Sequence, residues 1–201
     1  MPPQFIYLAS ASPRRAELLR QLGVNFQMLL ADRSENIESI EEPRSKELPA
    51  DYVRRVAKLK LEAARRRLAR RRLKEAPILC ADTTVALGRR ILGKPAHPAE
   101  AREMLMSLAG RTHRVLTAIA VSAGPHSLIS MNTTHVEFSR FSVLAIDSYV
   151  DSGEPRDKAG AYAIQGKAGT WVKRIDGSYT GVMGLPLYET AVLLRQAGIR
   201  I

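Results

Sequence analysis

The sequence contains very little cysteine and has no long apolar run. Cys80 is the only cysteine among the 201 residues, which excludes an intramolecular disulfide and a cysteine-based metal cluster. No apolar run approaches the roughly 20 residues that a membrane-spanning helix requires. The apolar start FIYLA is too short for a signal peptide, and no basic stretch precedes it. We therefore expect a cytoplasmic protein that makes no contact with a membrane.

Several common signatures of catalytic and nucleotide-binding sites are also missing. The sequence contains no P-loop, no GxGxxG fingerprint and no nucleophile elbow. The four histidines show no spacing typical of metal ligands, and we interpret them as structural or surface residues.

Positive charge is abundant but confined to one segment. Of the net charge of +11, residues 54–74 carry +10, with eleven basic residues and one acidic residue. A nucleic-acid-binding helix is one interpretation, and a solvated helix end around RRRLARRR is the other. Aromatic residues make up only 5% of the chain, and none lies among these arginines. The segment therefore offers no aromatic side chain on which a base could stack. We expect no specific nucleic-acid partner.

The segment LASASPRRAELLRQLG predicts a helix with an unusual first turn. Ser12 is a favourable N-cap, Pro13 suits the first helical position, and Gly23 ends the helix. The positive end of the helix dipole favours acidic residues, yet Arg14 and Arg15 stand there. An anion bound by the helix terminus, the two guanidiniums and the hydroxyls of Ser10 and Ser12 resolves this conflict.

Alternating strand and helix patterns predict an α/β fold over a single domain of residues 1–201. Strands are expected at residues 6–10, 26–31, 76–82, 112–123 and 131–138, with another after residue 170. Helices are expected from Pro13, over 54–74, 96–110 and 142–153, and over 186–196, with a hairpin at Gly88 and a loop over 32–49. Residues 83–142 could form a second lobe, although no linker marks a boundary.

A few polar residues stand where an apolar pattern would be expected. Asp82 ends the apolar run ILCAD, where a carboxylate can hold a divalent ion, accept a proton from water, or simply cap a turn. Lys60 interrupts the apolar stripe of the basic helix and Lys94 follows the hairpin, so each is either a ligand-binding cation or a snorkelling side chain. Gln165 lies in the glycine-rich stretch DKAGAYAIQG, where an amide can pair with a base edge.

Five ordered motifs resemble those of the Maf family of nucleotide pyrophosphatases. These are LASASPRR, ADTTV, LGKP, DKAGAYAIQG and GLPL, and together they extend over nearly the whole chain. The resemblance implies a Maf-like α/β fold, similar to that of inosine triphosphate pyrophosphatase, with an elongated mixed sheet and two lobes around a deep cleft. It also implies a homodimer that hydrolyses a nucleoside triphosphate to the monophosphate and pyrophosphate with a divalent cation, Mg²⁺ or Mn²⁺.

The resemblance further implies roles for individual residues. Asp82 matches the catalytic carboxylate, and Asp82 with Glu35 matches the metal site. The phosphate-binding positions are Ser10, Ser12, Arg14, Arg15, Lys60 and Lys94, and the positions that set base preference are Arg14, Thr83 and Gln165. The form AYAIQG resembles the branch that acts on dTTP and UTP. A pyrophosphatase for 7-methyl-GTP or inosine-type nucleotides is the alternative.

Overall fold

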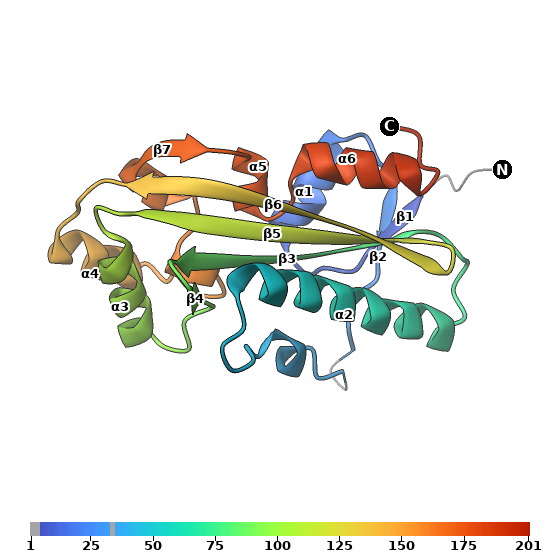
Figure 1. The fold of residues 1–201 in the computed structure, drawn as a ribbon, viewed down its shortest axis with the longest axis horizontal. Coiled ribbons are helices and arrows are strands. Elements are labelled where there is room, and N and C mark those ends of the chain that lie inside the picture. Colours follow the sequence, from blue (N-terminus) through green and yellow to red (C-terminus); the bar gives the residue numbers. More distant parts are fainter. Residues whose placement is uncertain (1–4, 33–34) are drawn as a thin grey trace.

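The computed structural model describes residues 5–32 and 35–201, which form one mixed sheet with helices packed against it (Figure 1). The strands are β1 (Ile6–Leu8), β2 (Phe26–Met28), β3 (Ile78–Leu87), β4 (Arg90–Leu92), β5 (Thr112–Ala123), β6 (His126–Phe138) and β7 (Val172–Asp176). The α-helices are α1 (Pro13–Gln21), α2 (Pro49–Arg70), α3 (Pro98–Leu108), α4 (Val143–Asp151), α5 (Tyr179–Met183) and α6 (Leu187–Gln196). Three short 3-10 helices are η1 (Glu38–Glu41), η2 (Ala159–Ala161) and η3 (Lys167–Trp171).

The strands follow the order β2-β1-β3-β5-β6-β7, and β4 pairs with the far end of β3. β1 runs parallel to both of its neighbours, whereas β3, β5, β6 and β7 pair antiparallel. The predicted α/β class and mixed sheet are therefore confirmed, and the sheet stays open. No helix within residues 5–32 and 35–201 is both long and apolar enough to span a bilayer.

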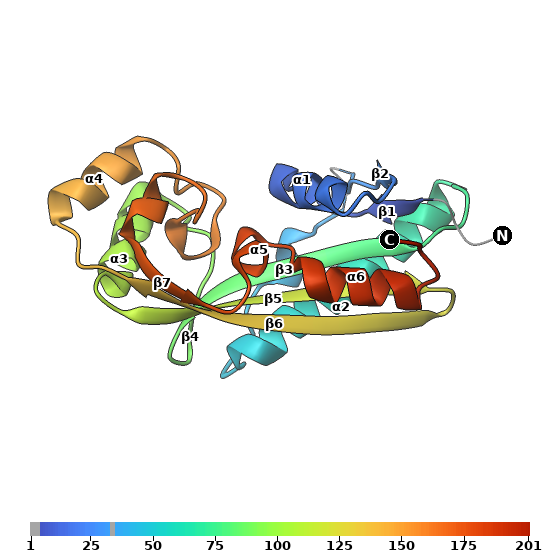
Figure 2. The same ribbon diagram turned by 90° about the horizontal axis from the view of Figure 1, so that it is seen from above.

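Helices cover both faces of this sheet (Figure 2). α2 packs on one face through a cluster that includes Val53, Val56 and Ala57, which are all fully buried. α1 and α6 pack on the opposite face around Leu19 and Leu194. A third cluster joins α3 and α4 to the ends of β3, β5 and β6. α1, α2, α3, α4 and α6 therefore each bury an apolar side against the sheet.

The registers of β3 create an open segment in the middle of the sheet. β1 pairs with Ile78 and Leu79, and β4 pairs with Val85–Leu87. Within the described residues, the stretch between these two pairings has a strand only on its β5 side. Asp82 and Thr83 lie in this stretch, so their surroundings on the other edge are set by loops rather than by a neighbouring strand.

Several sequence predictions need correction. The strand containing Asp82 continues to Leu87, because the β-branched residues Thr83, Thr84 and Val85 extend it, so Asp82 lies inside β3 and not at its end. β1 and β2 are shorter than predicted and β6 begins earlier, at His126. The short helix α5 was not predicted. The loop predicted over 32–49 contains η1, and α2 begins at Pro49. Residues 33–34 of this loop lie outside the described ranges.

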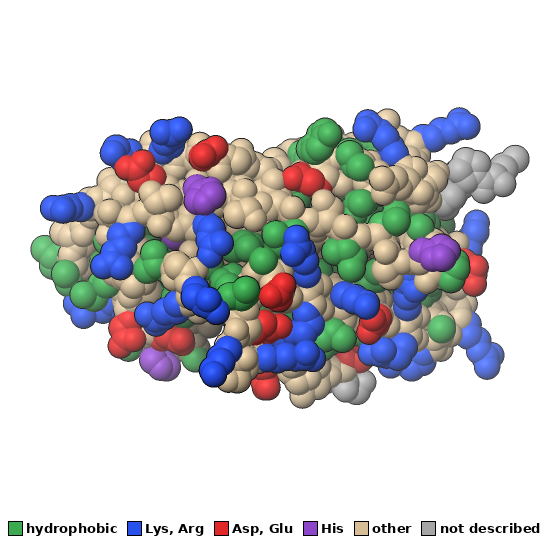
Figure 3. Space-filling view, viewed as in Figure 1, with side chains coloured by type: hydrophobic (Ala, Val, Ile, Leu, Met, Phe, Trp, Pro, Cys, Tyr) green, Lys and Arg blue, Asp and Glu red, His purple; other side chains and the backbone are tan. Residues whose placement is uncertain are grey.

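The basic helix is bound by carboxylates of the loop that precedes it. Arg67 is only 3% exposed and pairs with Glu35 at 2.7 Å, while its Nη1 donates to the carbonyl of Leu29 at 2.8 Å. Arg70 and Arg71 both pair with Asp32. Acidic and basic side chains are interleaved over this face of the molecule (Figure 3). The interpretation of RRRLARRR as a solvated helix end is therefore wrong for Arg67.

The helix starts at Pro13 and Pro98, the hairpin at Gly88 and the end of the last helix before Gly198 agree with the prediction. The single domain with a second lobe over residues 83–142 stays a prediction.

Candidate active site

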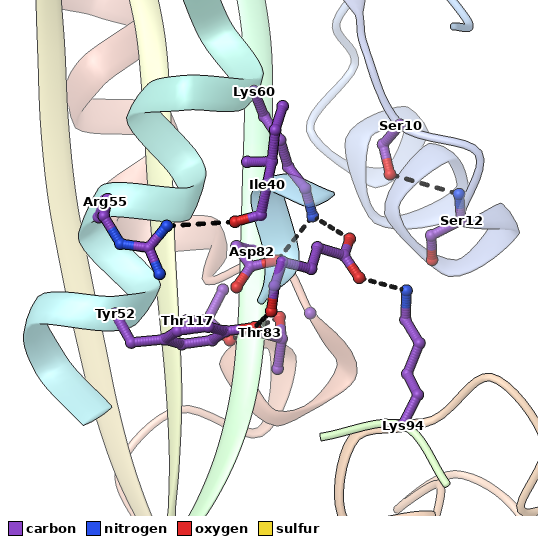
Figure 4. A network of polar contacts seen from close by, with 12 residues as sticks. Ser10, Ser12, Ile40, Tyr52, Arg55, Lys60, Asp82, Thr83, Lys94 and Thr117 are labelled. Carbon is purple, nitrogen blue, oxygen red and sulfur yellow. Dashed lines mark hydrogen bonds and ion pairs between the residues drawn. The ribbon is translucent and has the colours of Figure 1, made fainter. Parts of the chain in front are cut away.

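A cleft of about 770 Å³ opens beside the free edge of β3. It brings together the carboxyl end of β1, the start of α1, the acidic loop, α2 and the glycine-rich stretch, as Figure 4 shows for part of the site. The polar residues lining it are Ser10, Ser12, Arg14, Arg15, Glu41, Lys60, Arg67, Asp82, Thr83, Lys94, Arg156, Asp157, Lys158 and Tyr162. Most predicted site residues therefore meet in one cavity, although they come from distant parts of the sequence.

The first turn of α1 faces this cleft with its N–H groups uncapped. Ser12 is the N-cap residue, but its hydroxyl makes no capping hydrogen bond, contrary to prediction. Pro13 follows, and the first turn contains no acidic residue. Unpaired N–H groups at a helix start attract anions. This end of the helix is thus electrostatically prepared for a phosphate.

The two adjacent arginines of this turn have different roles. The Nε of Arg15 donates to the Gly184 carbonyl at 2.8 Å, and its two terminal nitrogens donate to Ser10 Oγ and Thr83 Oγ1, both at 3.1 Å. Burial lowers the pKa of Arg15, and the Asp82 carboxylate opposes that shift. Arg14 lines the cleft, and the described residues supply no hydrogen-bond acceptor to its guanidinium. Arg14 is therefore available to a ligand, whereas Arg15 mainly organises the site.

Lys60 joins two carboxylates at the centre of the cleft. Its Nζ lies 2.7 Å from Asp82 Oδ1 (Figure 4). The same Nζ lies 2.6 Å from Glu41 Oε1. Lys94 contacts the other oxygen of Glu41 at 2.7 Å. Burial alone would raise the pKa of Glu41, but the two ammonium groups outweigh it and hold the pKa at about 2. Glu41 is thus held as an anion beside two cations.

The second oxygen of Asp82 is buried without a partner. Among the described residues, no hydrogen-bond donor reaches Asp82 Oδ2. A buried carboxylate oxygen normally has a partner, because leaving it unpaired costs about 1–3 kcal/mol or more. Such an oxygen is free to accept a proton from water or to bind a cation.

The structure places Glu35 outside this arrangement. Its carboxylate pairs with Arg67 and also with Arg70, at 2.9 Å, and Glu35 is not among the residues that line the cleft. The hydrogen bond from Arg67 is the largest influence that lowers the pKa of Glu35 to about 2. Glu41 occupies the place beside Asp82 that the resemblance gave to Glu35. The loop has no apolar periodicity, so nothing in the sequence distinguished these two glutamates.

Gln165 is exposed and does not line the cleft, unlike its neighbours Lys158, Tyr162 and Ile164. Burial and the charge of Arg14 lower the pKa of Lys158. The chain around Gln165 is closely packed, since a Cβ on Gly166 would lie 1.8 Å from an oxygen of Glu154. Sequence reasoning found this stretch but did not identify which of its side chains faces the cleft.

An uncapped helix start and a cluster of cations around a buried carboxylate define an α/β protein built to hold a polyanionic ligand. The chain belongs to the Maf family, because the family's sequence model, described as Maf-like protein, matches residues 5–197. This confirms the resemblance seen in the five sequence motifs.

Curated relatives match this chain over almost its entire length. A protein of Polaromonas sp. (strain JS666 / ATCC BAA-500) is 55% identical over 197 residues, 98% of each chain. One of Cupriavidus pinatubonensis is 56% identical over 198 residues, again 98% of each chain. A relative from Burkholderia pseudomallei (strain K96243) is 52% identical and covers 97% of this chain and 94% of its own. Each of these relatives is named dTTP/UTP pyrophosphatase.

Proposed function

We propose that this protein is a nucleoside triphosphate pyrophosphatase that hydrolyses dTTP and UTP to the monophosphate and pyrophosphate. The observation that carries the proposal is the unpartnered Asp82 oxygen, which lies in the same cleft as the uncapped start of α1. The names of the near full-length relatives support the choice of bases. A 7-methyl-GTP or inosine-type activity has no such support.

We assign a separate task to each side chain from its place in the cleft. Arg14, Ser10, Ser12 and the N–H groups of α1 bind the triphosphate, and Lys94 adds a cation at the opposite rim. Asp82 accepts a proton from the attacking water through its free oxygen. The water oxygen bonds to the α phosphorus, the bond to the α–β bridging oxygen breaks, and pyrophosphate leaves with that electron pair. Lys60 keeps Asp82 oriented, since it holds the other carboxylate oxygen at 2.7 Å.

A divalent cation fits the residues present. Oxygen ligands suit Mg²⁺ and Mn²⁺, and Mg²⁺ is usually held by one or two carboxylates together with substrate phosphates and water. Asp82 would contribute its free Oδ2, and Glu41 would become the second ligand by exchanging one of the two ammonium groups that contact its oxygens. The described residues contain no group of three or more acidic, His or Cys ligands. Bound there, the cation supplies Lewis-acid stabilisation and acidifies water. We assign the second ligand to Glu41 in place of Glu35.

Base selection is proposed to involve Arg14 and Thr83, which line the cleft, and Gln165, which the family resemblance adds. The same resemblance supports a homodimer, and we propose that the protein acts in the cytoplasm.

A nucleic-acid-binding role is less well supported. Arg67, Arg70 and Arg71 are engaged with Glu35 and Asp32, and Arg65 donates to carbonyls of the turn at residues 124–126. These contacts leave few of the block's guanidiniums for phosphates.

A product assay tests the proposal. The protein with Mg²⁺ or Mn²⁺ is given UTP, dTTP, CTP, 7-methyl-GTP and ITP, and the products are separated by ion exchange. We expect UMP or dTMP and pyrophosphate in equal amounts from UTP or dTTP. Release of orthophosphate alone from UTP would show attack at the γ phosphorus and overturn the proposal.

A further inference from the structure

One guanidinium in the cleft sets the hydrogen-bonding polarity of Ser10. A hydroxyl carries one proton and two lone pairs. Ser10 Oγ accepts from Arg15 at 3.1 Å and from the backbone N–H of Ser12 at 3.3 Å. Both lone pairs are then engaged, so the remaining capacity of Ser10 is its O–H. Toward a ligand in the cleft, Ser10 acts as a donor, which matches a phosphate oxygen.

The same guanidinium and a buried threonine give Thr83 the opposite polarity. Thr83 Oγ1 accepts from Arg15 at 3.1 Å and lies 2.9 Å from Thr117 Oγ1. Thr117 donates its single proton to the Gly181 carbonyl at 2.8 Å. The proton shared between the two threonines must therefore come from Thr83. What remains on Thr83 is one lone pair, so it can only accept from a ligand.

The acceptor role of Thr83 is fixed because its partner Thr117 is buried. Thr117 is 1% exposed, so solvent does not compete for its hydroxyl. The Gly181 carbonyl that receives its proton belongs to α5. Neighbouring Gly184 has a φ of +112°, and a Cβ there would approach Arg15 Nε at 3.4 Å and Thr83 Oγ1 at 3.5 Å. The Arg15 guanidinium, the two threonine hydroxyls and the Gly181 carbonyl are thus closely packed and joined by hydrogen bonds.

We propose that Thr117 is a positioning residue for base selection: it fixes Thr83 as an acceptor, so the cleft favours a pyrimidine whose N3 carries a proton over one whose N3 has a lone pair. This inference depends on the proposed pyrophosphatase function. Uracil and thymine carry a proton on N3, whereas cytosine has a lone pair there. A cytosine would bring two lone pairs together. Ionised phosphate oxygens carry no proton, so Thr83 is matched to the nucleoside part of the substrate and Ser10 to the phosphate end, and within the nucleoside the proposal assigns Thr83 to the base.

The test compares substrates within single variants, so that the fraction of folded protein cancels. Thr117→Val keeps the side-chain shape and removes the acceptor, which frees the Thr83 proton to point into the cleft. We expect the UTP-to-CTP ratio of kcat/KM to fall by roughly tenfold or more, as for one mispaired buried polar group. Thr117→Ser keeps a hydroxyl and should restore the wild-type ratio. Thr84→Val is the matched control, since Thr84 is also buried but faces the other side of β3.

A substrate analogue makes the same test from the ligand side. N3-methyl-UTP lacks the N–H, so the wild-type protein should prefer UTP over it, and Thr117→Val should reduce that preference. An unchanged UTP-to-CTP ratio in a folded Thr117→Val variant would overturn the inference. A ratio that falls equally in Thr84→Val would also overturn it, because any buried threonine would then serve. If the wild type releases no UMP and pyrophosphate from UTP, the proposed function itself fails.

Discussion

Replacing Glu41 by Gln tests whether Glu41, and not Glu35, is the second carboxylate ligand of the proposed cation site. The change keeps the size of the side chain but removes the negative charge that faces Lys60 and Lys94. Glu35→Gln is a matched control, because Glu35 is also a glutamate of the acidic loop that contacts two cations. The difference that the comparison uses is that only Glu41 lines the cleft.

The stability effect follows from the pKa of Glu41. The pKa falls from 4.5 to about 2 in the folded protein, and each pKa unit corresponds to about 1.4 kcal/mol. The full shift gives an upper limit of about 3 kcal/mol. The Glu41 side chain is 24% exposed, so solvent screening reduces the expected loss to about 1–2 kcal/mol at pH 7. Glu35→Gln should also destabilise the fold.

The pH dependence has a definite sign. A carboxyl whose pKa is lowered by folding contributes stability above its unfolded pKa, and this contribution disappears as the pH falls through its folded pKa. The difference in unfolding free energy between wild type and Glu41→Gln should therefore be constant above about pH 5. It should then shrink steadily toward pH 2. Urea unfolding of both proteins at a series of pH values measures it.

Cation binding and activity separate the two glutamates. Glu41→Gln should weaken Mn²⁺ binding, followed by electron paramagnetic resonance, and should raise the Mg²⁺ concentration needed for half-maximal activity. Glu35→Gln should leave both unchanged. A Glu35→Gln variant that loses Mn²⁺ affinity while Glu41→Gln retains it would refute the reassignment. A stability difference that does not vary with pH would refute the electrostatic argument.

Three further perturbations test the rest of the site. Asp82→Asn should lower kcat by about 10²–10⁴ with little change in nucleotide affinity, and near wild-type kcat in a steady-state assay would exclude it as the base. Arg14→Ala should weaken nucleotide binding by about 1.5–3 kcal/mol without lowering the melting temperature of the free protein, since a charge that opposes the helix dipole is removed. Arg15→Ala should lower the melting temperature of the free protein, because three hydrogen bonds are lost, and equal melting curves for the two arginine variants would contradict their separate roles. Binding to duplex DNA should be weak at physiological salt, and tight sequence-specific binding in a fluorescence titration would favour the nucleic-acid alternative.

Local rules of sequence predicted the elements that have clear boundaries. Pro13 and Pro98 mark helix starts because proline tolerates the first helical position, and Gly88 permits the turn between β3 and β4. The candidate anion site at the start of α1 was found from the sequence because two arginines there oppose the helix dipole. The helix α5 escaped prediction because its five residues contain a glycine and carry no repeating apolar face.

The distinction between neighbouring residues of one type needed the tertiary structure. Arg14 and Arg15 have the same chemistry and adjacent positions, and only the Gly184 carbonyl and two hydroxyls separate their roles. Glu35 and Glu41 are likewise distinguished by their partners, since Glu35 pairs with Arg67 and Arg70 of α2. Glu41 pairs with Lys60 of α2 and with Lys94, which follows β4. Asp82 seemed to end a strand because the apolar run stops there, yet the residues that follow have high strand propensity.

The hydrogen bond from Arg15 to Gly184 has a consequence for how the protein is made. The two residues are 169 positions apart, so the donor leaves the ribosome long before its acceptor is synthesised. Domains form from the N-terminus as the chain emerges, but this contact cannot form until the last segment before α6 is free. Arg15, near the N-terminus, therefore acquires its final hydrogen bonds late, and a nascent or C-terminally truncated chain has the first turn of α1 without the Gly184 carbonyl that orients Arg15.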